Sequence, residues 1–543
     1  MLAYFLVYAA LLLPPVWAAF GLTESGNSYV VDTDGGLVFT VDKTSGDVTS
    51  MKYNGKEAQD SSKHSQISSG IGATCGWVRT GNSNNYIKIT CTTSTLTHYY
   101  VAKYKDPSIH MATYTTAEPS VGELRYIARL ARSTVPNGYA ASNVDGGSAI
   151  EGSDVFLVNG QTRSKFYSSR QFIDDQVHGV TGSAIGIYMV IYGNGYEASS
   201  GGPFFRDINN QGGSVQELYF CECIATFSCE HTSDGIFVRI DMNSGHTQTE
   251  GWRTGLHGPY ALVFTSGAAP SANIDPLFWE GLGVQGYVGN SGRGRVSGKA
   301  SGFPSQFASL ISVGFSNSQN QYWVRTDTSG NFVTPYMKPG TYTMTLYKVE
   351  LAIGSQSATV SAGGTTSANI ASSEANPAVI WQIGDFDGTP RGFLNADKIE
   401  TMHPSDSRMA SWGGKTFTVG NNVNTFPMAI FKDIGGVTIK FTLTSSQLGA
   451  RTLQIGTTLA FAGGRPVVVV NSWTSAIPAI PSQPDSRGVT RGTWRGNNIM
   501  YTYNIPAGTL IAGTNTISIT VASGSSGAQF LSPNIVFDAL RLY

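Results

Sequence analysis

The sequence predicts an all-β protein made of three domains in series, and three observations support this. Charged residues make up only 13% of the chain, whereas Gly, Ser, Thr, Tyr and Phe are abundant, a composition typical of β-strands joined by turns. Short segments of alternating polarity recur, and no long stretch has the 3.6-residue periodicity of a helix. The chain of 543 residues also exceeds the roughly 250–300 residues that one core can serve.

Changes in composition divide the chain into three regions. Residues 19–282 contain strand-like segments such as GLVFTVD, YIKITCT and IGIYMVIY, separated by Gly, Asn, Asp and Ser turns. Residues 283–372 are rich in Gly and include YMKPGTYTMTLYK and QSATVSAGGTTSANI, which predict a small antiparallel sandwich. Residues 373–543 contain evenly spaced segments such as VTIKFTLT and GRPVVVVNSW, which predict a jelly roll.

Residues 1–18 predict a secretory signal peptide. An apolar run ends in Val16-Trp17-Ala18, with small residues where signal peptidase cleaves, so we expect cleavage after Ala18 and a secreted, extracellular protein. Pro14-Pro15 interrupts the run before the roughly 20 apolar residues that a membrane-spanning helix needs. Cys75 and Cys91 lie in a strand-turn-strand pattern and could pair outside the cell, but two cysteines alone leave the pairing open.

The charge distribution bears on the class of partner. The net charge is −1, so the chain lacks the basic footprint of a nucleic-acid-binding protein. Lys and Arg are scattered singly, which argues against a polybasic membrane patch. We therefore expect neither nucleic acid nor membrane as a partner, and nothing in the sequence requires more than a monomer.

Three polar segments are candidates for chemistry. In the first, Arg163, Lys165, Tyr167 and Arg170 follow an apolar strand and predict either a solvated strand end or a sugar cleft with a reactive Lys165. The other two segments each offer a pair of side chains, and each pair has an ordinary structural alternative. One pair is His246 and His257, with Gly245 permitting close approach of a ligand, and the other is Arg125 and Arg129, whose guanidinium forks suit a carboxylate partner.

Common hydrolase motifs do not select a site. The sequence contains no G-x-S-x-G, H-E-x-x-H or P-loop pattern. A glycosidase would need two close carboxylates, and no motif selects a pair among Asp154, Asp174, Asp175 and Asp207.

Long collinear stretches resemble one family, the fungal rhamnogalacturonan lyases of polysaccharide lyase family 4. They cover nearly the whole mature chain in order, which is far more specific than a short motif. Among them are HMATYTTAEPSVGELRYIARL, EGSDVFLVNGQTRSKFYSS, SSGGPFFRDI, MNSGHTQTE, GLHGPYALVF, MKPGTYTMTLY, HPSDSRMASWG, FAGGRP, DSRGVTRG and SPNIVFDAL.

The resemblance implies a fold and a reaction. The fold would be a large catalytic β-sandwich of the galactose-mutarotase-like, super-sandwich type, a fibronectin-III-like domain and a carbohydrate-module-like jelly roll. The substrate would be the rhamnogalacturonan I backbone of pectin, cleaved by β-elimination at the rhamnosyl-galacturonate bond without a cofactor or catalytic metal. Two alternatives stay open, a non-catalytic pectin-binding protein and a hydrolase that uses a carboxylate pair.

The resemblance also assigns roles to residues. Elimination needs a base at C5 of galacturonate, and neutralising the adjacent carboxylate stabilises the enolate-like transition state. The family's lysine base matches Lys165, whose pKa must fall through burial or nearby cations. The family's histidine matches His246, its carboxylate-binding arginine matches Arg125, and Tyr219 is one of a pair of tyrosines expected to line the cleft.

The segment FCECIATFSCEH, residues 220–231, departs from the family pattern. Three of the five cysteines lie here, and three interpretations compete. A metal site would use Cys221, Cys223, Cys229 and His231, but the spacing is not the usual C-x₂₋₄-C, and secreted thiols oxidise. A disulfide loop would leave one cysteine unpaired.

The favoured hypothesis is that residues 221–241 are a retained intron translated in frame. Cys221-Glu222-Cys223 can be encoded as TGT-GAG-TGY, which contains the donor sequence GTGAGT, and Ile240-Asp241 as ATA-GAY, which supplies a terminal AG. Splicing would leave one tyrosine between Phe220 and Met242, which is the tyrosine that the family pattern expects.

Overall fold

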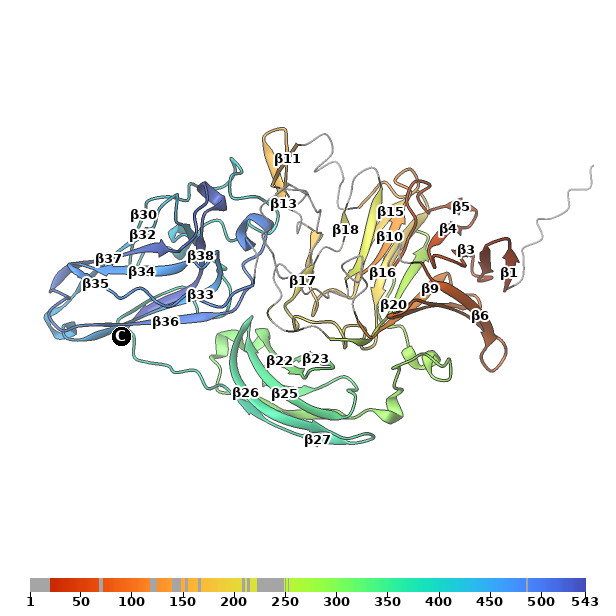
Figure 1. Ribbon diagram of the computed structural model, residues 1–543. Helices are drawn as coiled ribbons and strands as arrows, with labels where there is room; N and C mark the ends of the chain where they lie inside the picture. Colours follow the sequence, from red (N-terminus) through yellow and green to blue (C-terminus); the bar gives the residue numbers. More distant parts are fainter. Residues whose placement is uncertain are drawn as a thin grey trace, which may run out of the picture.

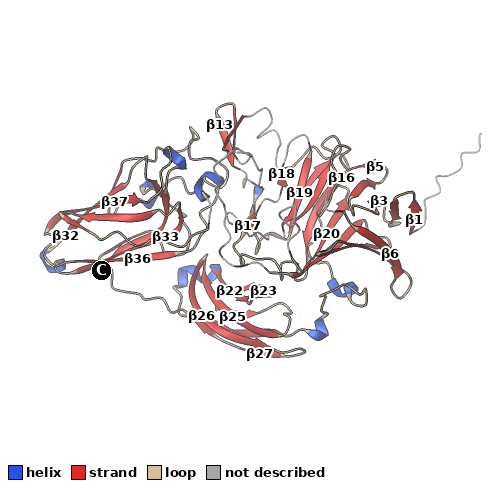
Figure 2. Cartoon of the chain, in the orientation of Figure 1, coloured by secondary structure: helices blue, strands red, loops and turns tan. Residues whose placement is uncertain are grey.

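A computed structural model describes most of the chain, and strands dominate it. The described residues are 20–67, 72–117, 125–138, 148–151, 155–164, 168–207, 210–211, 215–221, 249, 251, 253–484 and 487–543. Figure 2 shows their strands with only short helical turns between them. The prediction of an all-β protein is confirmed. The predicted signal peptide, Lys165, His246 and the cysteine segment after Cys221 lie outside these residues.

The first domain contains a seven-stranded antiparallel sheet that is buried on both faces. One face packs against a five-stranded sheet around Phe39 and Tyr100, and the other is covered by the segment around Trp279. Burial on both faces explains why its central strands are continuously apolar instead of alternating. In spatial order the sheet consists of β15 (Val177–Gly182), β16 (Ile185–Ile191), β20 (Gly255–Thr265), β9 (Ser108–Thr115), β8 (Leu96–Lys103), β7 (Tyr86–Thr92) and β6 (Thr74–Thr80).

A smaller sheet of the first domain packs against the same core. Its strands, in order, are β10 (Arg125–Leu130), β19 (Gln216–Cys221) and β18 (Asn210–Gln211). The five-stranded sheet is made of β1 (Gly21–Ser25), β2 (Ser28–Asp32), β3 (Leu37–Asp42), β4 (Val48–Tyr53) and β5 (Lys56–Glu57). Two further small sheets join β11 (Ser148–Glu151), β12 (Val155–Val158) and β13 (Gln161–Ser164), and β14 (Arg170–Gln171) with β17 (Arg206–Asp207).

The second domain is a sandwich of two four-stranded sheets around Val313, Phe315 and Met344. In β25 the buried and exposed residues alternate, as expected for a strand with one face in a core. The first sheet contains β21 (Arg295–Ser301), β24 (Asn331–Val333), β27 (Thr365–Ser367) and β28 (Ile370–Ala371), and the second contains β22 (Ile311–Ser316), β23 (Gln321–Arg325), β25 (Gly340–Lys348) and β26 (Leu351–Val360).

The third domain is also a sandwich, built from two five-stranded sheets with an aromatic-rich core. Figure 1 shows the three domains side by side, with the third domain in blue and the hairpin containing β13 between it and the sheets of the first. The strands of the third domain form two sheets. One contains β29 (Trp381–Ile383), β31 (Ala429–Phe431), β33 (Arg451–Phe461), β36 (Ile499–Ile505) and β38 (Asn534–Leu542), and the other contains β30 (Lys415–Thr418), β32 (Val437–Leu443), β34 (Arg465–Val470), β35 (Trp473–Thr474) and β37 (Gly513–Ala522).

A buried ionic cluster joins the first two domains. Glu197 accepts hydrogen bonds from both terminal nitrogens of Arg293, at 2.7 and 3.1 Å, and from the Tyr322 hydroxyl at 2.8 Å. Lys338 Nζ lies 2.9 Å from the same carboxylate. Burial opposes ionisation of Glu197, but the two cations outweigh it and hold the pKa of Glu197 below its usual range.

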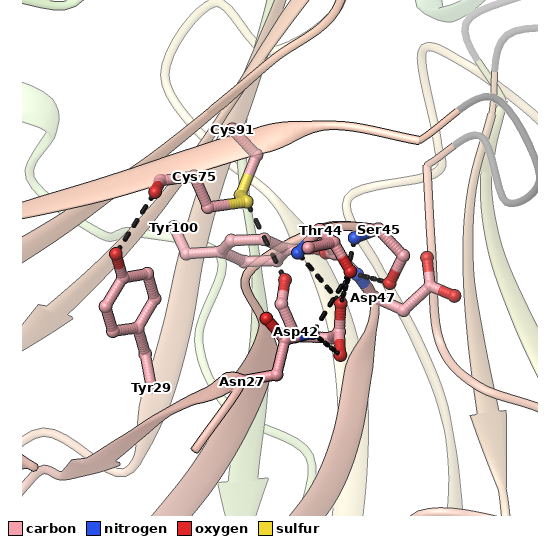
Figure 3. The surroundings of a disulfide bond; sticks show 10 residues. Asn27, Tyr29, Asp42, Thr44, Ser45, Asp47, Cys75, Cys91 and Tyr100 are labelled. Atoms are coloured by element: carbon pink, nitrogen blue, oxygen red, sulfur yellow. Dashed lines mark hydrogen bonds between the residues drawn. A yellow bond between two sulfur atoms is a disulfide. The ribbon is translucent and has the colours of Figure 1, made fainter. Parts of the chain in front are cut away.

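Cys75 and Cys91 form a disulfide between the paired strands β6 and β7, with their Cα atoms 4.1 Å apart. Figure 3 shows the surroundings of the bond, in which the Tyr29 hydroxyl donates to the Cys75 carbonyl at 3.1 Å and Tyr100 donates to Gly46 at 2.8 Å. The pairing that the sequence left open is therefore made, in a part of the sheet held by several long-range contacts.

Candidate active site

The pair of strands β10 and β19 brings two predicted site residues to one end. Arg125 lies opposite Cys221, and Ile127 lies opposite Tyr219, so the backbones of Arg125 and Tyr219 are close neighbours across the ladder. The Arg125 side chain is partly exposed, whereas the side chain of Tyr219 lies outside the described ones. The register thus places two of the four predicted residues together at the level of the backbone.

Aromatic rings in the core of the first domain pack against this strand pair. Phe220, next to Tyr219, is fully buried and stacks on Tyr260 with ring centroids 4.2 Å apart. Tyr126 and Tyr196 also contact these two rings, at 5.9 Å from Tyr260 and 5.8 Å from Phe220 respectively. Such contacts fix the strand at the last position before the cysteine segment begins.

Arg129 has a carboxylate partner within the protein. Its Nε lies 3.2 Å from the Glu217 carboxylate, on the residue directly opposite in the ladder. Arg129 therefore fits the alternative of an ordinary strand residue, because its positive charge is already paired with the Glu217 carboxylate. Arg125 stays the prediction for the arginine that binds a substrate carboxylate.

The position of Lys165 follows directly after a described strand. Strand β13 ends at Ser164 and pairs only with β12 among the described strands. Of the neighbouring cations, the Arg163 side chain lies outside the described ones, and Arg170 is exposed and donates to the Val177 carbonyl at 3.3 Å. Lys165 itself stays a prediction.

His246 lies outside the described residues and stays a prediction. Thr249, three residues further along the chain, lines a cavity of about 230 Å³ between the domains. Trp323 and Tyr347 of the second domain and Arg495 of the third line the same cavity. Aromatic faces combined with a cation suit a ring-shaped polar ligand.

His257, the other histidine of that segment, has a different character. It is fully buried in β20, and burial lowers the pKa of His257 to about 3. The imidazole is therefore neutral at any working pH, and the alternative of a structural histidine holds for it.

Two of the four candidate carboxylates already contact polar side chains within the protein. The exposed Asp174 forms a 2.6 Å ion pair with Arg325 of the second domain. The buried Asp175 accepts from the Tyr196 hydroxyl at 2.9 Å and lies 3.0 Å from His178 Nδ1. Burial opposes ionisation of Asp175, but His178 and Tyr196 hold its pKa below the usual value, so it does not behave as a catalytic acid. The other two, Asp154 and Asp207, have side chains outside the described ones.

The described ranges hold neither a candidate metal site nor a candidate membrane-spanning helix. No three His, Cys, Asp or Glu side chains there gather closely enough to hold a metal ion. None of the helices in the same ranges has the length and apolarity needed to cross a membrane.

Comparisons with known proteins match each domain. The family model described as "Rhamnogalacturonan lyase B, N-terminal" matches residues 20–286. Those for polysaccharide lyase family 4, domain II and domain III, match residues 292–368 and 379–542.

Curated relatives match along the whole chain. A protein of Aspergillus fumigatus named "Probable rhamnogalacturonate lyase A" is 53% identical over 98% of both chains. "Rhamnogalacturonate lyase A" of Emericella nidulans is 52% identical over 97% of this chain and 96% of its own, and the Aspergillus aculeatus protein of the same name matches with the same values.

A protein with three β domains in this order, each matching a lyase domain, is a polysaccharide lyase. The chain belongs to polysaccharide lyase family 4, as a rhamnogalacturonan lyase. The resemblance drawn from the sequence is confirmed at the level of family, fold and enzyme class.

One contact next to the predicted site could not be identified from the sequence. Asp406 and Arg408 lie in the stretch HPSDSRMASWG, which was used only as a mark of the family. In the structure this loop of the third domain contacts β13, three residues before Lys165. The acidic and basic residues two positions apart were a signal, but their partner is 244 residues away and no local pattern could identify it.

Proposed function

We propose that the protein is a secreted rhamnogalacturonan endolyase. It cleaves the rhamnosyl-(1→4)-galacturonate bond of the rhamnogalacturonan I backbone by β-elimination and leaves an unsaturated galacturonate at the new non-reducing end. Membership of the family supports this proposal, and the observation that carries it is the placement of Arg125 beside Tyr219 in a ladder within the lyase domain. Residues 19–282 form the catalytic domain, 283–372 the fibronectin-III-like domain and 373–543 the carbohydrate-module-like domain in this proposal.

The proposed reaction uses three side chains. Arg125 pairs with the galacturonate carboxylate and so stabilises the enolate-like transition state. Neutral Lys165 takes the proton from C5, a double bond forms between C4 and C5, and the bond between C4 and the glycosidic oxygen breaks. His246 gives its proton to the departing oxygen, so that charge and atoms balance. Tyr219 lines the sugar cleft.

Product analysis on purified rhamnogalacturonan tests this function. We expect ultraviolet absorbance from the unsaturated product, and its loss in Lys165→Ala and His246→Ala. Saturated ends would instead indicate a hydrolase. Binding to the polysaccharide without any product would favour the non-catalytic pectin-binding protein.

Residues 221–241 bear on the same test. We propose that they are a retained intron and that the spliced form, with one tyrosine in their place, is the active one. The insertion begins at the end of β19, next to Phe220 and Tyr219, and a misplacement of about 1 Å in an active site can cost about a hundredfold in rate. The chain as written would then have low catalytic activity or low stability.

A further inference from the structure

We infer that Asp406 and Arg408 of the third domain are positioning residues for catalysis, because they fix strand β13 and with it the proposed base. The inference rests on the proposed function of Lys165. It gives the third domain a part in the catalytic site besides any role in binding carbohydrate.

A single carboxylate oxygen of Asp406 receives two hydrogen bonds from β13. The backbone amide of Thr162 donates to Oδ2 at 2.7 Å, and the Thr162 hydroxyl donates to the same oxygen at 2.8 Å. The backbone amide of His403, in the same loop as Asp406, donates to the Thr162 hydroxyl at 3.1 Å. Thr162 is thus held through both its main chain and its side chain.

Arg408 completes the anchor by contacting both oxygens of the same carboxylate. Its Nε donates to Asp406 Oδ1 at 2.8 Å and its Nη2 to Oδ2 at 2.6 Å, while Nη2 also lies 3.4 Å from the Thr162 carbonyl. This two-pronged geometry is the strong form of an ion pair and fixes direction as well as distance. Burial opposes ionisation of Asp406, but hydrogen bonds from Arg408 and Thr162 outweigh it and hold the pKa of Asp406 well below its usual range.

The contact between Thr162 and Asp406 is buried, and the loop that contains Asp406 packs against the core of the third domain. Thr162 is 1% exposed and Asp406 3%, so loss of either partner would leave a desolvated polar group. Trp412, at the end of the loop, packs edge-on against Phe431 of the core, and its indole donates to the Pro404 carbonyl at 2.9 Å. The loop therefore holds β13 in a fixed position relative to the core of the third domain.

The hairpin needs such an anchor. Strands β11, β12 and β13 form a separate three-stranded sheet among the described strands, and Leu157 of its central strand is 37% exposed, so the sheet buries little apolar surface of its own. Strand β13 ends at Ser164, and Lys165 is the next residue of the chain and the third after Thr162. A shift at Thr162 would therefore move the amine relative to C5 of the substrate, and catalytic rates are sensitive to such shifts.

Two sets of variants test the inference. Asp406→Asn keeps the shape but removes the charge, and Thr162→Val removes the hydroxyl while Thr162→Ser retains it. Asp174→Asn is the matched control, since it breaks another contact between domains, with Arg325, and does not touch β13. All are measured both in the full chain and in the form with tyrosine in place of residues 221–241.

We expect Asp406→Asn to lower kcat on rhamnogalacturonan by about 10- to 100-fold with KM within about twofold, and to shift the pH profile of kcat/KM. Thr162→Val should lower kcat by a smaller factor, and Thr162→Ser should restore it. Hydrogen exchange at the Thr162 amide should become faster in Asp406→Asn. A purely structural role would lower the amount of folded enzyme and leave the pH profile unchanged.

Wild-type kcat and pH profile in Asp406→Asn, with Lys165→Ala inactive, would overturn the inference and leave the proposed function intact. Full activity in Lys165→Ala would overturn the proposed role of Lys165 as the base, whereas saturated product ends would overturn the proposed function itself. If Asp406→Asn does not fold, the pair Thr162→Val and Thr162→Ser decides, because equal kcat in both would contradict an anchor at this residue.

Discussion

Thr162 in the first domain and Asp406 in the third are joined by two hydrogen bonds to one carboxylate oxygen, across 244 residues of sequence. An ionic contact between the same two domains lies at Arg206, whose Nη1 is 2.6 Å from Glu400 Oε1. The third domain is therefore joined to the first by a buried carboxylate and by a partly exposed ion pair, unlike a module that hangs from a flexible linker.

Arg125 and Arg129 should respond differently to substitution. Arg125→Ala should lower kcat/KM on rhamnogalacturonan by at least about 100-fold, because the substrate carboxylate would remain charged. Arg129→Ala breaks only a partly exposed ion pair with Glu217 and should lower kcat/KM by less than about threefold. Steady-state kinetics of both variants provide the measurement. Equal losses in the two would contradict the assignment of the carboxylate site to Arg125.

Phe220 should be a major contributor to the stability of the first domain. Phe220→Ala would remove a ring that is 1% exposed and stacked on Tyr260, and should lower the free energy of unfolding by about 3–5 kcal/mol. Val78→Ala serves as the control, since Val78 is 50% exposed and its truncation should change stability little. Denaturant titration of the three proteins measures the difference. A loss below 1 kcal/mol in Phe220→Ala would mean that the ring contributes little to holding β19.

Glu350 predicts a dependence of stability on pH. Burial raises the pKa of Glu350 to about 7, although Arg391, Arg495 and Arg206 act to lower it, and its carboxylate accepts from Gln171 at 2.7 Å. The folded chain then holds a proton that the unfolded chain releases above its usual pKa of 4.5. The free energy of unfolding should therefore fall by up to about 3 kcal/mol as pH rises from 4.5 to 7.

Glu350→Gln provides the comparison, because a neutral amide cannot titrate. We expect its thermal unfolding midpoint to lose the part of the pH dependence that lies between pH 4.5 and 7. Identical pH profiles for the two proteins would show that Glu350 is ionised throughout in the folded state.

The disulfide should contribute measurably to stability. Cys75 and Cys91 are 16 residues apart, and a bond that closes a loop of that size stabilises by about 3 kcal/mol in the loop-entropy account. Cys75→Ser with Cys91→Ser should therefore lower the Tm by several degrees. Reductant should lower the Tm of the parent protein and leave that of the double variant unchanged, and a response in both would point to another cysteine.

The retained-intron hypothesis makes a prediction about nucleic acid as well as activity. Transcript sequencing should find a product joined between Phe220 and Met242 with one tyrosine, and the codon for Cys221 should be TGT. The spliced protein should turn over rhamnogalacturonan faster than the chain as written. Any other codon for Cys221, or equal turnover by both forms, would end the hypothesis.

Local patterns in the sequence were enough for the fold class but only partly for the site. Alternation and Gly-rich turns identify strands such as β25, and continuous apolar runs such as β16 identify strands buried on both faces. Whether a charged side chain already has a partner within the protein depends on how the chain folds, and local sequence patterns do not reveal it. The roles of Arg129, Asp175 and Asp406 therefore became clear only when Glu217, His178 and Thr162 were placed beside them.

The position of β38 affects the order in which parts of the enzyme can fold during synthesis. This last strand, Asn534–Leu542, pairs with β29, β31 and β33 and so closes the core to which the Asp406 loop is fastened. A nascent chain emerging from the ribosome can complete its first two sandwiches long before that strand is synthesised. The hairpin that leads to Lys165 must wait for the final residues, so any premature stop, even one close to the end of the message, removes the support of a residue encoded hundreds of codons upstream.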